Sequence, residues 1–197
     1  MRKVIVNEFM SLDGVVQAPG GEDEDTSGGF EHGGWHMGYM EDELAQTRVL
    51  ESIVEAGGFL LGRRTYEIFA AYWPKAPADE QVIAVPLNTK PKYVPSASLA
   101  EPLAWENATL LKGDVADAVA ALKQADGGDL HVIGSAELVQ ALIEHDLVDE
   151  FRLMIDPVVL GGGKRIFRDD GVRRRLQLVK SEATSTGAIL ATYAPAA

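Results

Sequence analysis

Residues 147–167, LVDEFRLMIDPVVLGGGKRIF, form the most distinctive stretch of the chain. The apolar run at 151–160 is typical of a buried strand, and the three glycines at 161–163 predict a turn directly after it. A second apolar run, AILATYA at 188–194, follows after a polar crossover. The two runs predict a pair of strands that ends the chain and forms an antiparallel edge.

Toward the N-terminus, strand-like and helix-like segments alternate. Short apolar runs predict strands at 4–6, 59–61, 82–85, 92–94, 109–111 and 129–133. Apolar residues near helical spacing predict helices at 41–56, 63–73, 115–124 and 136–145. This alternation is typical of an α/β fold with a mostly parallel sheet and helices on both faces.

The composition excludes several classes of protein. The 197 residues, 46% hydrophobic and 24% charged, suit a single globular domain over 1–197. Without cysteine there is no thiol nucleophile and no disulfide, which fits a cytoplasmic protein. A net charge of -12 disfavours binding to nucleic acids and to membrane surfaces, because both are anionic.

A long loop, rich in glycine and acidic residues, is predicted at residues 17–40. Loops of this length in a small domain are often mobile lids or binding loops, and we expect the same here. Trp35 and Tyr39 are its candidates for stacking on a substrate ring. His32 and His36 lie close in sequence, but no rigid element fixes them, so no metal site is predicted.

Two strand–glycine–helix junctions are candidates for binding phosphate. The first is Gly62-Arg63-Arg64-Thr65, where a helix N-terminus would offer unpaired N–H groups and two arginines would add charge. The alternative is a plain turn whose arginines pair with surface carboxylates. The second is Gly134-Ser135 with the helix after it, for which a simple connector with a serine cap is the alternative.

In this order, and joined to the stretch at 147–167, these motifs resemble one known family. It is the reductase domain at the C-terminal end of bifunctional riboflavin-biosynthesis proteins, a branch of the dihydrofolate-reductase-like superfamily. Residues 11–14, SLDG, resemble the loop after its first strand, and the two junctions resemble its phosphate-binding turns. The resemblance covers nearly the whole chain and implies a three-layer α/β/α sandwich that binds NADPH.

Residue by residue, the resemblance implies a cofactor site on both sides of the sheet edge. Val16 would lie near the nicotinamide, and Ser96 near the adenosine 2′-phosphate. Many relatives carry a basic residue after that serine, where this chain has Ala97, so NADH is kept as an alternative to NADPH. The remaining cofactor residues are the two junctions: Gly62, Arg63, Arg64, Thr65, Gly134, Ser135, Ala136, Glu137 and Leu138.

A proton donor is the least defined part of the predicted site. Glu43 resembles the acidic residue on the helix that follows the mobile loop in folate reductases, although a solvated helix face explains it equally well. Asp13 is the other candidate, and its alternative is a turn residue that bonds its own backbone.

The resemblance implies an NADPH-dependent oxidoreductase that reduces a C=N or C=O bond in a small pterin- or pyrimidine-like heterocycle. The relatives show Val-Glu-Gly-Gly where this chain has Val132-Ile133-Gly134-Ser135, and the lost carboxylate argues against a phosphoribosyl-aminopyrimidine substrate. The alternative is a non-catalytic nucleotide-binding or regulatory module on the same fold. A homodimer is also expected, because such reductases commonly form one.

Overall fold

The computed structural model describes residues 1–196. Its strands are β1 (Val4–Ser11), β2 (Gly58–Leu60), β3 (Lys92–Pro95), β4 (Ala108–Leu111), β5 (Leu130–Ile133), β6 (Glu150–Asp156), β7 (Leu176–Ala183) and β8 (Ile189–Pro195). Its helices are α1 (Glu43–Glu55), α2 (Arg63–Tyr72), α3 (Gln81–Thr89), α4 (Val115–Gln124) and α5 (Ala136–Glu144). Short 3-10 turns include η1 (Ser27–Gly29), η2 (Met37–Glu41) and η4 (Ala78–Glu80).

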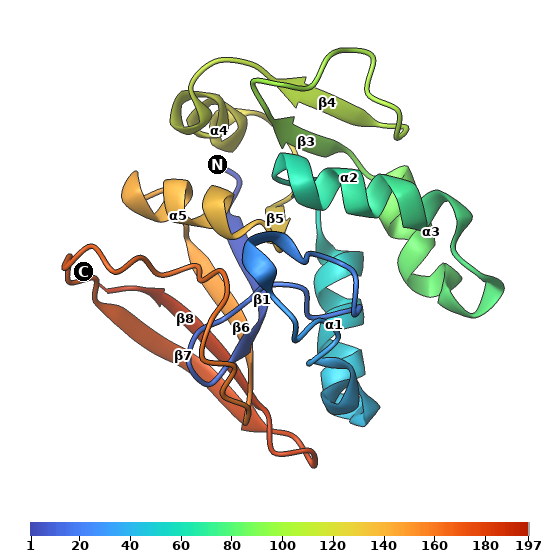
Figure 1. Ribbon diagram of the computed structural model, residues 1–197. Coiled ribbons are helices and arrows are strands. Elements are labelled where there is room, and N and C mark those ends of the chain that lie inside the picture. Colours follow the sequence, from blue (N-terminus) through green and yellow to red (C-terminus); the bar gives the residue numbers. More distant parts are fainter. Residues whose placement is uncertain (197) are drawn as a thin grey trace.

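The described strands form one sheet in the order β4-β3-β2-β5-β1-β6-β8-β7 (Figure 1). The six strands from β4 to β6 run parallel, whereas β8 is antiparallel to both β6 and β7. The mostly parallel sheet with an antiparallel C-terminal edge confirms the fold class predicted from the sequence.

Helices cover both faces of the parallel part. On one face, Val6 of β1 and Val132 of β5 pack in a core with Val139 of α5 and Val119 of α4. On the other face, Phe59 of β2 packs in a second core to which helices α1, α2 and α3 contribute Ile53, Tyr66 and Leu87. Full burial of such a side chain contributes about 1.5–3 kcal/mol, so the two cores fix which helix lies on which face.

The structure corrects the strand predicted at residues 82–85, which is part of helix α3. The turn η4 leads directly into this helix, and the helix continues past Pro86 to Thr89. Ala84 and Leu87, three residues apart, are its buried side chains, while Val82 and Val85 are exposed. The buried positions therefore follow the period of a helix. The sequence could not show this period, because all four residues at 82–85 are apolar.

The predicted polar crossover before the last strand is also wrong, because it contains strand β7. This strand lies at the edge of the sheet and is exposed along most of its length. An edge strand with little burial lacks the apolar alternation that identifies a strand in a sequence.

The predicted loop at 17–40 contains η1 and the start of η2, and it packs against the rest of the molecule. Ala18 and Phe30 are buried with Val15, and Trp35 lies against them. Among residues 1–196, no helix combines the length and the apolar character needed to cross a membrane.

Candidate active site

The carboxyl ends of the central parallel strands open into a cleft of about 1430 Å³. Helix α2 leaves β2 toward one face of the sheet, and α5 leaves the neighbouring β5 toward the other. Neighbouring parallel strands whose helices take opposite faces leave a crevice, where such folds bind ligands. Because a ligand pocket usually measures about 300–1,000 Å³, this cleft has room for a dinucleotide and a second small molecule.

Helices α2 and α5 present uncapped N-termini to this cleft. Helix α3 also lacks a side-chain cap, but it continues directly from the turn η4. Helix α2 begins after Gly62 and α5 after Ser135, and neither has a side chain that accepts a bond from its first turn. The first intrahelical bonds are donated by Tyr66 and Val139, so the N–H groups of the three preceding residues have no helical partner. Such groups carry partial positive charge, and two sets of them in one cleft suit an anion.

Ser135 connects the two junctions through hydrogen bonds. Its hydroxyl accepts a hydrogen bond from the Gly62 N–H (2.8 Å) and donates one to Thr65 Oγ1 (2.7 Å). A Cβ at position 62 would lie only 3.0 Å from the Ser135 Cβ, so the close approach favours glycine. Ser135 itself has a φ of 72°, a left-handed conformation that turns the chain from β5 into α5.

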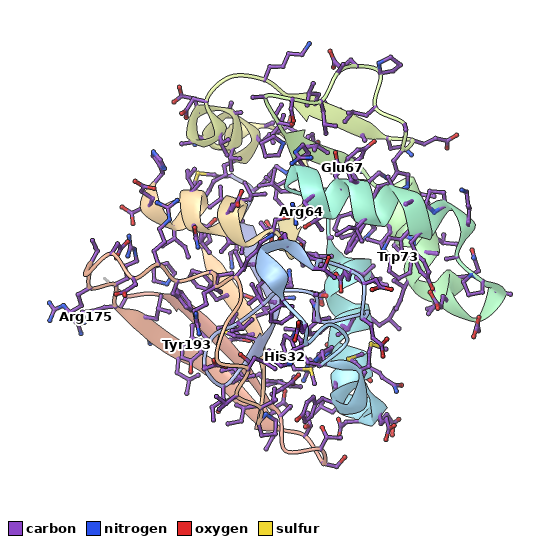
Figure 2. The ribbon with its side chains drawn as sticks, in the orientation of Figure 1. His32, Arg64, Glu67, Trp73, Arg175 and Tyr193 are labelled. Atoms are coloured by element: carbon purple, nitrogen blue, oxygen red, sulfur yellow. The ribbon has the colours of Figure 1, made fainter. Side chains whose placement is uncertain are left out.

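Cationic side chains lie beside these junctions. Arg64, at the start of α2 beside the 17–40 loop (Figure 2), forms an ion pair with Asp25 of that loop. Lys164 reaches the same carboxylate at 2.6 Å. Burial works to raise the pKa of Asp25, but hydrogen bonds from Lys164 and Ser27 outweigh it and hold the pKa at about 2. Arg63 pairs with the exposed Glu67 at 3.0 Å.

The structure brings all the predicted cofactor residues to this one cleft. Val16, Ser96 and both junctions line it, from Gly62 to Thr65 and from Gly134 to Leu138. Their lining of one cleft agrees with the prediction, and their role in binding a cofactor remains a prediction.

The two predicted proton donors, Asp13 and Glu43, do not line the cleft. Asp13 accepts hydrogen bonds from the Ser11 hydroxyl (2.7 Å) and from the N–H groups of Leu160 (3.1 Å) and Gly161 (2.9 Å). The Ser11 bond is the main reason that the Asp13 pKa falls to about 2. Because Asp13 is a carboxylate at neutral pH, it has no proton to donate. Its environment therefore favours the alternative interpretation, a residue that stabilises the turn.

Glu43 is exposed in the first turn of α1, and its neighbour Asp42 caps that helix. Asp42 accepts bonds from the N–H of Ala45 (3.0 Å) and from the N–H (2.7 Å) and hydroxyl (2.6 Å) of Ser185. The placement of Glu43 favours the solvated helix face.

The predicted stacking residues also lie outside the cleft lining. The Trp35 indole donates to the Gln17 carbonyl at 2.8 Å and packs with Val15 and Phe30. Tyr39 packs against Ala45 and its neighbours. Both side chains therefore hold the loop against the fold in this structure.

Three polar groups that the sequence reasoning missed do line the cleft. Each has one buried polar atom without a hydrogen-bond partner in the described part of the chain: Asn7 Oδ1, Glu8 Oε1 and His36 Nε2. The other ring nitrogen of His36 contacts Asp156 at 2.7 Å, and Phe9 stacks on the ring. Buried polar atoms are nearly always bonded, so unpartnered ones at a cleft point to a ligand.

A signal for Glu8 is present in the sequence. A central parallel strand, buried on both faces, is expected to be apolar throughout, and Asn7-Glu8 interrupts the run from Val4 to Met10. His36 gives no comparable signal, because its partner Asp156 lies 120 residues away in the sequence.

Comparison with known proteins is consistent with this geometry. The family model of the RibD C-terminal domain matches residues 2–190. The chain belongs to the RibD C-terminal domain family. The family resemblance seen in the sequence is thereby confirmed.

Two Bacillus subtilis proteins are similar to this chain over most of its length. The Bacillus subtilis (strain 168) protein YyaP is 30% identical over 194 residues, which is 98% of this chain and 94% of YyaP. YwjB of the same strain is 28% identical over 177 residues, or 90% of this chain and 89% of YwjB.

Two solved structures share the fold. A protein from Shewanella sp. PV-4 named for riboflavin biosynthesis has a TM-score of 0.70 and 21% identity, with 99% of each chain covered. A pyrimidine reductase-like protein from Corynebacterium diphtheriae has a TM-score of 0.65 and 13% identity, with 100% of this chain and 92% of that chain covered. At these identities the likeness shows the fold alone.

Proposed function

We propose that this RibD-type domain is an NADPH-dependent reductase of a small pterin- or pyrimidine-like heterocycle, with NADH as the alternative carrier. The observation that carries the proposal is the pair of uncapped helix N-termini, α2 and α5, that open into one cleft. The name of the pyrimidine reductase-like structural neighbour supports the choice of substrate class.

The residues present fit a dinucleotide. The free N–H groups at the start of α2 and α5 would bind its pyrophosphate, and Arg64 with Lys164 would supply positive charge once their carboxylate partner Asp25 gives way. Ser96 would lie near the 2′-phosphate, but the adjoining Ala97 and Ser98 add no charge there. We therefore expect only a small preference for NADPH over NADH.

When bound, the nicotinamide supplies a hydride. The protein's part is to hold the substrate at the carboxyl ends of β1 and β5, to exclude water, and to provide a proton for the atom that gains negative charge. Val16, Leu138 and Leu153 give the cleft an apolar wall against which a flat ring can pack.

A second copy of the chain is the proposed partner. The edge strand β7 exposes Leu178 and Val179, and exposed apolar side chains on an unpaired edge favour association. Light scattering should give twice the mass of the chain, and a monomer would contradict this part of the proposal. A cytoplasmic location stays a prediction.

The experiment that tests the cofactor is a titration with NADPH and NADH, followed by tryptophan fluorescence. The double variant Arg63→Ala/Arg64→Ala should bind NADPH at least about tenfold more weakly, since it loses two positive charges at the phosphate. The matched control, Arg173→Ala/Arg174→Ala, removes the same charge outside the cleft lining and should bind as the wild type does.

Two results would contradict the proposal. Failure of the wild type to bind either nucleotide would remove the reductase assignment, and equal binding by the double variant would remove the cofactor site at α2. NADPH binding without oxidation in the presence of pterins, pyrimidines and quinones would favour the non-catalytic module.

A further inference from the structure

Glu8 is a buried carboxyl group in the middle of the sheet. Its side chain is 6% exposed, it lines the cleft, and its Oε1 has no hydrogen-bond partner among residues 1–196. Leaving a buried polar atom unpaired costs stability, and a leucine in a central strand would avoid that cost. The chain therefore keeps an unpaired acid where the fold itself has no use for one.

The strand register places Glu8 beside the phosphate-binding junction. Asn7 pairs with Ile133, the last residue of β5, so Glu8 is level with Gly134, the residue that follows that strand. Neighbouring strands lie about 4.8 Å apart. Side chains alternate along a strand, so Glu8 shares the face of Val6 and Met10, whose core includes Val16 of the first loop and Leu138 of α5.

Within residues 1–196, no charged side chain pairs with Glu8. His131 on β5 and Arg152 on β6 pair in register with Ile5 and Asn7, so their side chains lie on the opposite face of the sheet. Glu137 of α5 has the same charge sign, and Lys164 is bound to Asp25.

Burial alone raises the pKa of the Glu8 carboxyl well above its ordinary value. A carboxyl group in this setting keeps its proton under conditions in which exposed acids have lost theirs.

We propose that Glu8 supplies the proton that the substrate takes up when its C=N or C=O bond is reduced. The inference rests on the proposed reductase function. The substrate carbon gains the hydride, and the electron pair of the double bond moves to nitrogen or oxygen. That atom bonds the proton as the O–H bond of Glu8 breaks, and the Glu8 carboxylate recovers a proton from water that enters the cleft. In sum, one hydride and one proton are added to the substrate.

The test compares the wild type with Glu8→Gln, which resembles the protonated acid in shape and charge. NADPH affinity is measured from pH 6 to pH 10. As the pH rises through the raised pKa, wild-type Glu8 becomes an anion in the cleft that holds the negatively charged NADPH. The affinity of the wild type for NADPH should therefore fall about tenfold. Glu8→Gln has no carboxyl proton to lose at this position. Its NADPH affinity should therefore stay constant over the pH range in which the wild-type affinity falls.

A second readout needs no ligand. The infrared spectrum of the wild type at pH 7 should contain the C=O stretch of a protonated carboxyl, absent from Glu8→Gln and present in the control Glu41→Gln, whose acid is exposed. With the first substrate that oxidises NADPH, Glu8→Gln should lower kcat on the order of 100-fold and leave the KM for NADPH unchanged.

The outcomes separate this inference from the proposed function. If neither protein binds NADPH at any pH, the reductase function and the role of Glu8 both fail. If both bind NADPH with the same pH profile, or if the infrared band is missing at pH 7, the function stands and Glu8 is not the proton donor. An unchanged kcat in Glu8→Gln would overturn the inference in the same way.

Discussion

Helices α1 and α4 differ from α2 and α5 in how their N-termini are closed. Asp42 and Asp114 cap the first pair and accept bonds from the N–H groups of Ala45 and Asp117. The second pair begins after Gly62 and Ser135, without a side-chain cap. An N-cap contributes about 1 kcal/mol, so the chain gives up stability at the two helix ends that open into the cleft.

The difference indicates which helix N-termini are expected to bind a ligand. The capped N-termini have an aspartate as the partner of an N–H group, whereas the uncapped ones have unpaired donors, and α2 also begins with two arginines. The Asp42 cap also ties α1 to Ser185, which is a structural use of a helix end.

The largest expected effect comes from giving α5 a charged cap. Ser135→Asp would place a carboxylate at the proposed pyrophosphate site, and aspartate tolerates the left-handed conformation of this residue. We expect NADPH affinity to fall about 100-fold, because the new anion repels the phosphates and occupies their donors. Fluorescence titration measures the change.

The matched control is Ser135→Asn, which has the same shape and no charge. Its affinity should stay within about threefold of the wild type. An equal loss of NADPH affinity in both variants would mean that the shape of the side chain at position 135 decides binding, and not its charge at the N-terminus of α5.

A smaller effect is expected at the capped helices. Asp114→Ala should lower the free energy of unfolding by about 1 kcal/mol in urea, since the Asp117 N–H loses its partner. Asp42→Ala should lower it further, because Asp42 accepts three hydrogen bonds. NADPH affinity should not change in either variant, and a large loss of affinity would break the distinction between the two pairs of helices.

The smallest effect concerns the loop carboxylate that pairs with Arg64 and Lys164. Asp25→Asn should tighten NADPH binding about threefold, because a phosphate no longer competes with the Asp25 carboxylate for the same cations. Asp23→Asn removes the same charge from an exposed neighbour and should change the affinity less. Weaker binding in Asp25→Asn would show that this residue supports the site.

The sequence predicted those parts of the fold in which local pattern and burial agree. The buried runs around Val4, Phe59 and Leu130 and the Gly-Gly turns placed the parallel strands correctly. The predictions for residues 82–85 and for strand β7 were wrong for opposite reasons. The first is apolar but has helical burial, and the second is a strand with almost no burial.

The candidate site divides in the same way. The two junctions were predictable because a glycine between a strand and a helix carries its own signal. The pairing of His36 with Asp156 depends on tertiary structure, and no local pattern predicts it. Glu43 was proposed as an acid from the family resemblance, and Asp13 was the other candidate. Neither prediction could use burial, which distinguishes Glu8 from both residues.

The most direct test of the account is an amide NMR titration of the labelled protein with NADPH. We expect the largest shift changes at the N–H groups of residues 63–65 and 136–138, because these open helix ends would receive the phosphates. The first turns of α1 and α4 should change little. Shifts spread equally over all four helix ends, or confined to the capped pair, would contradict the central claim that α2 and α5 form the nucleotide site.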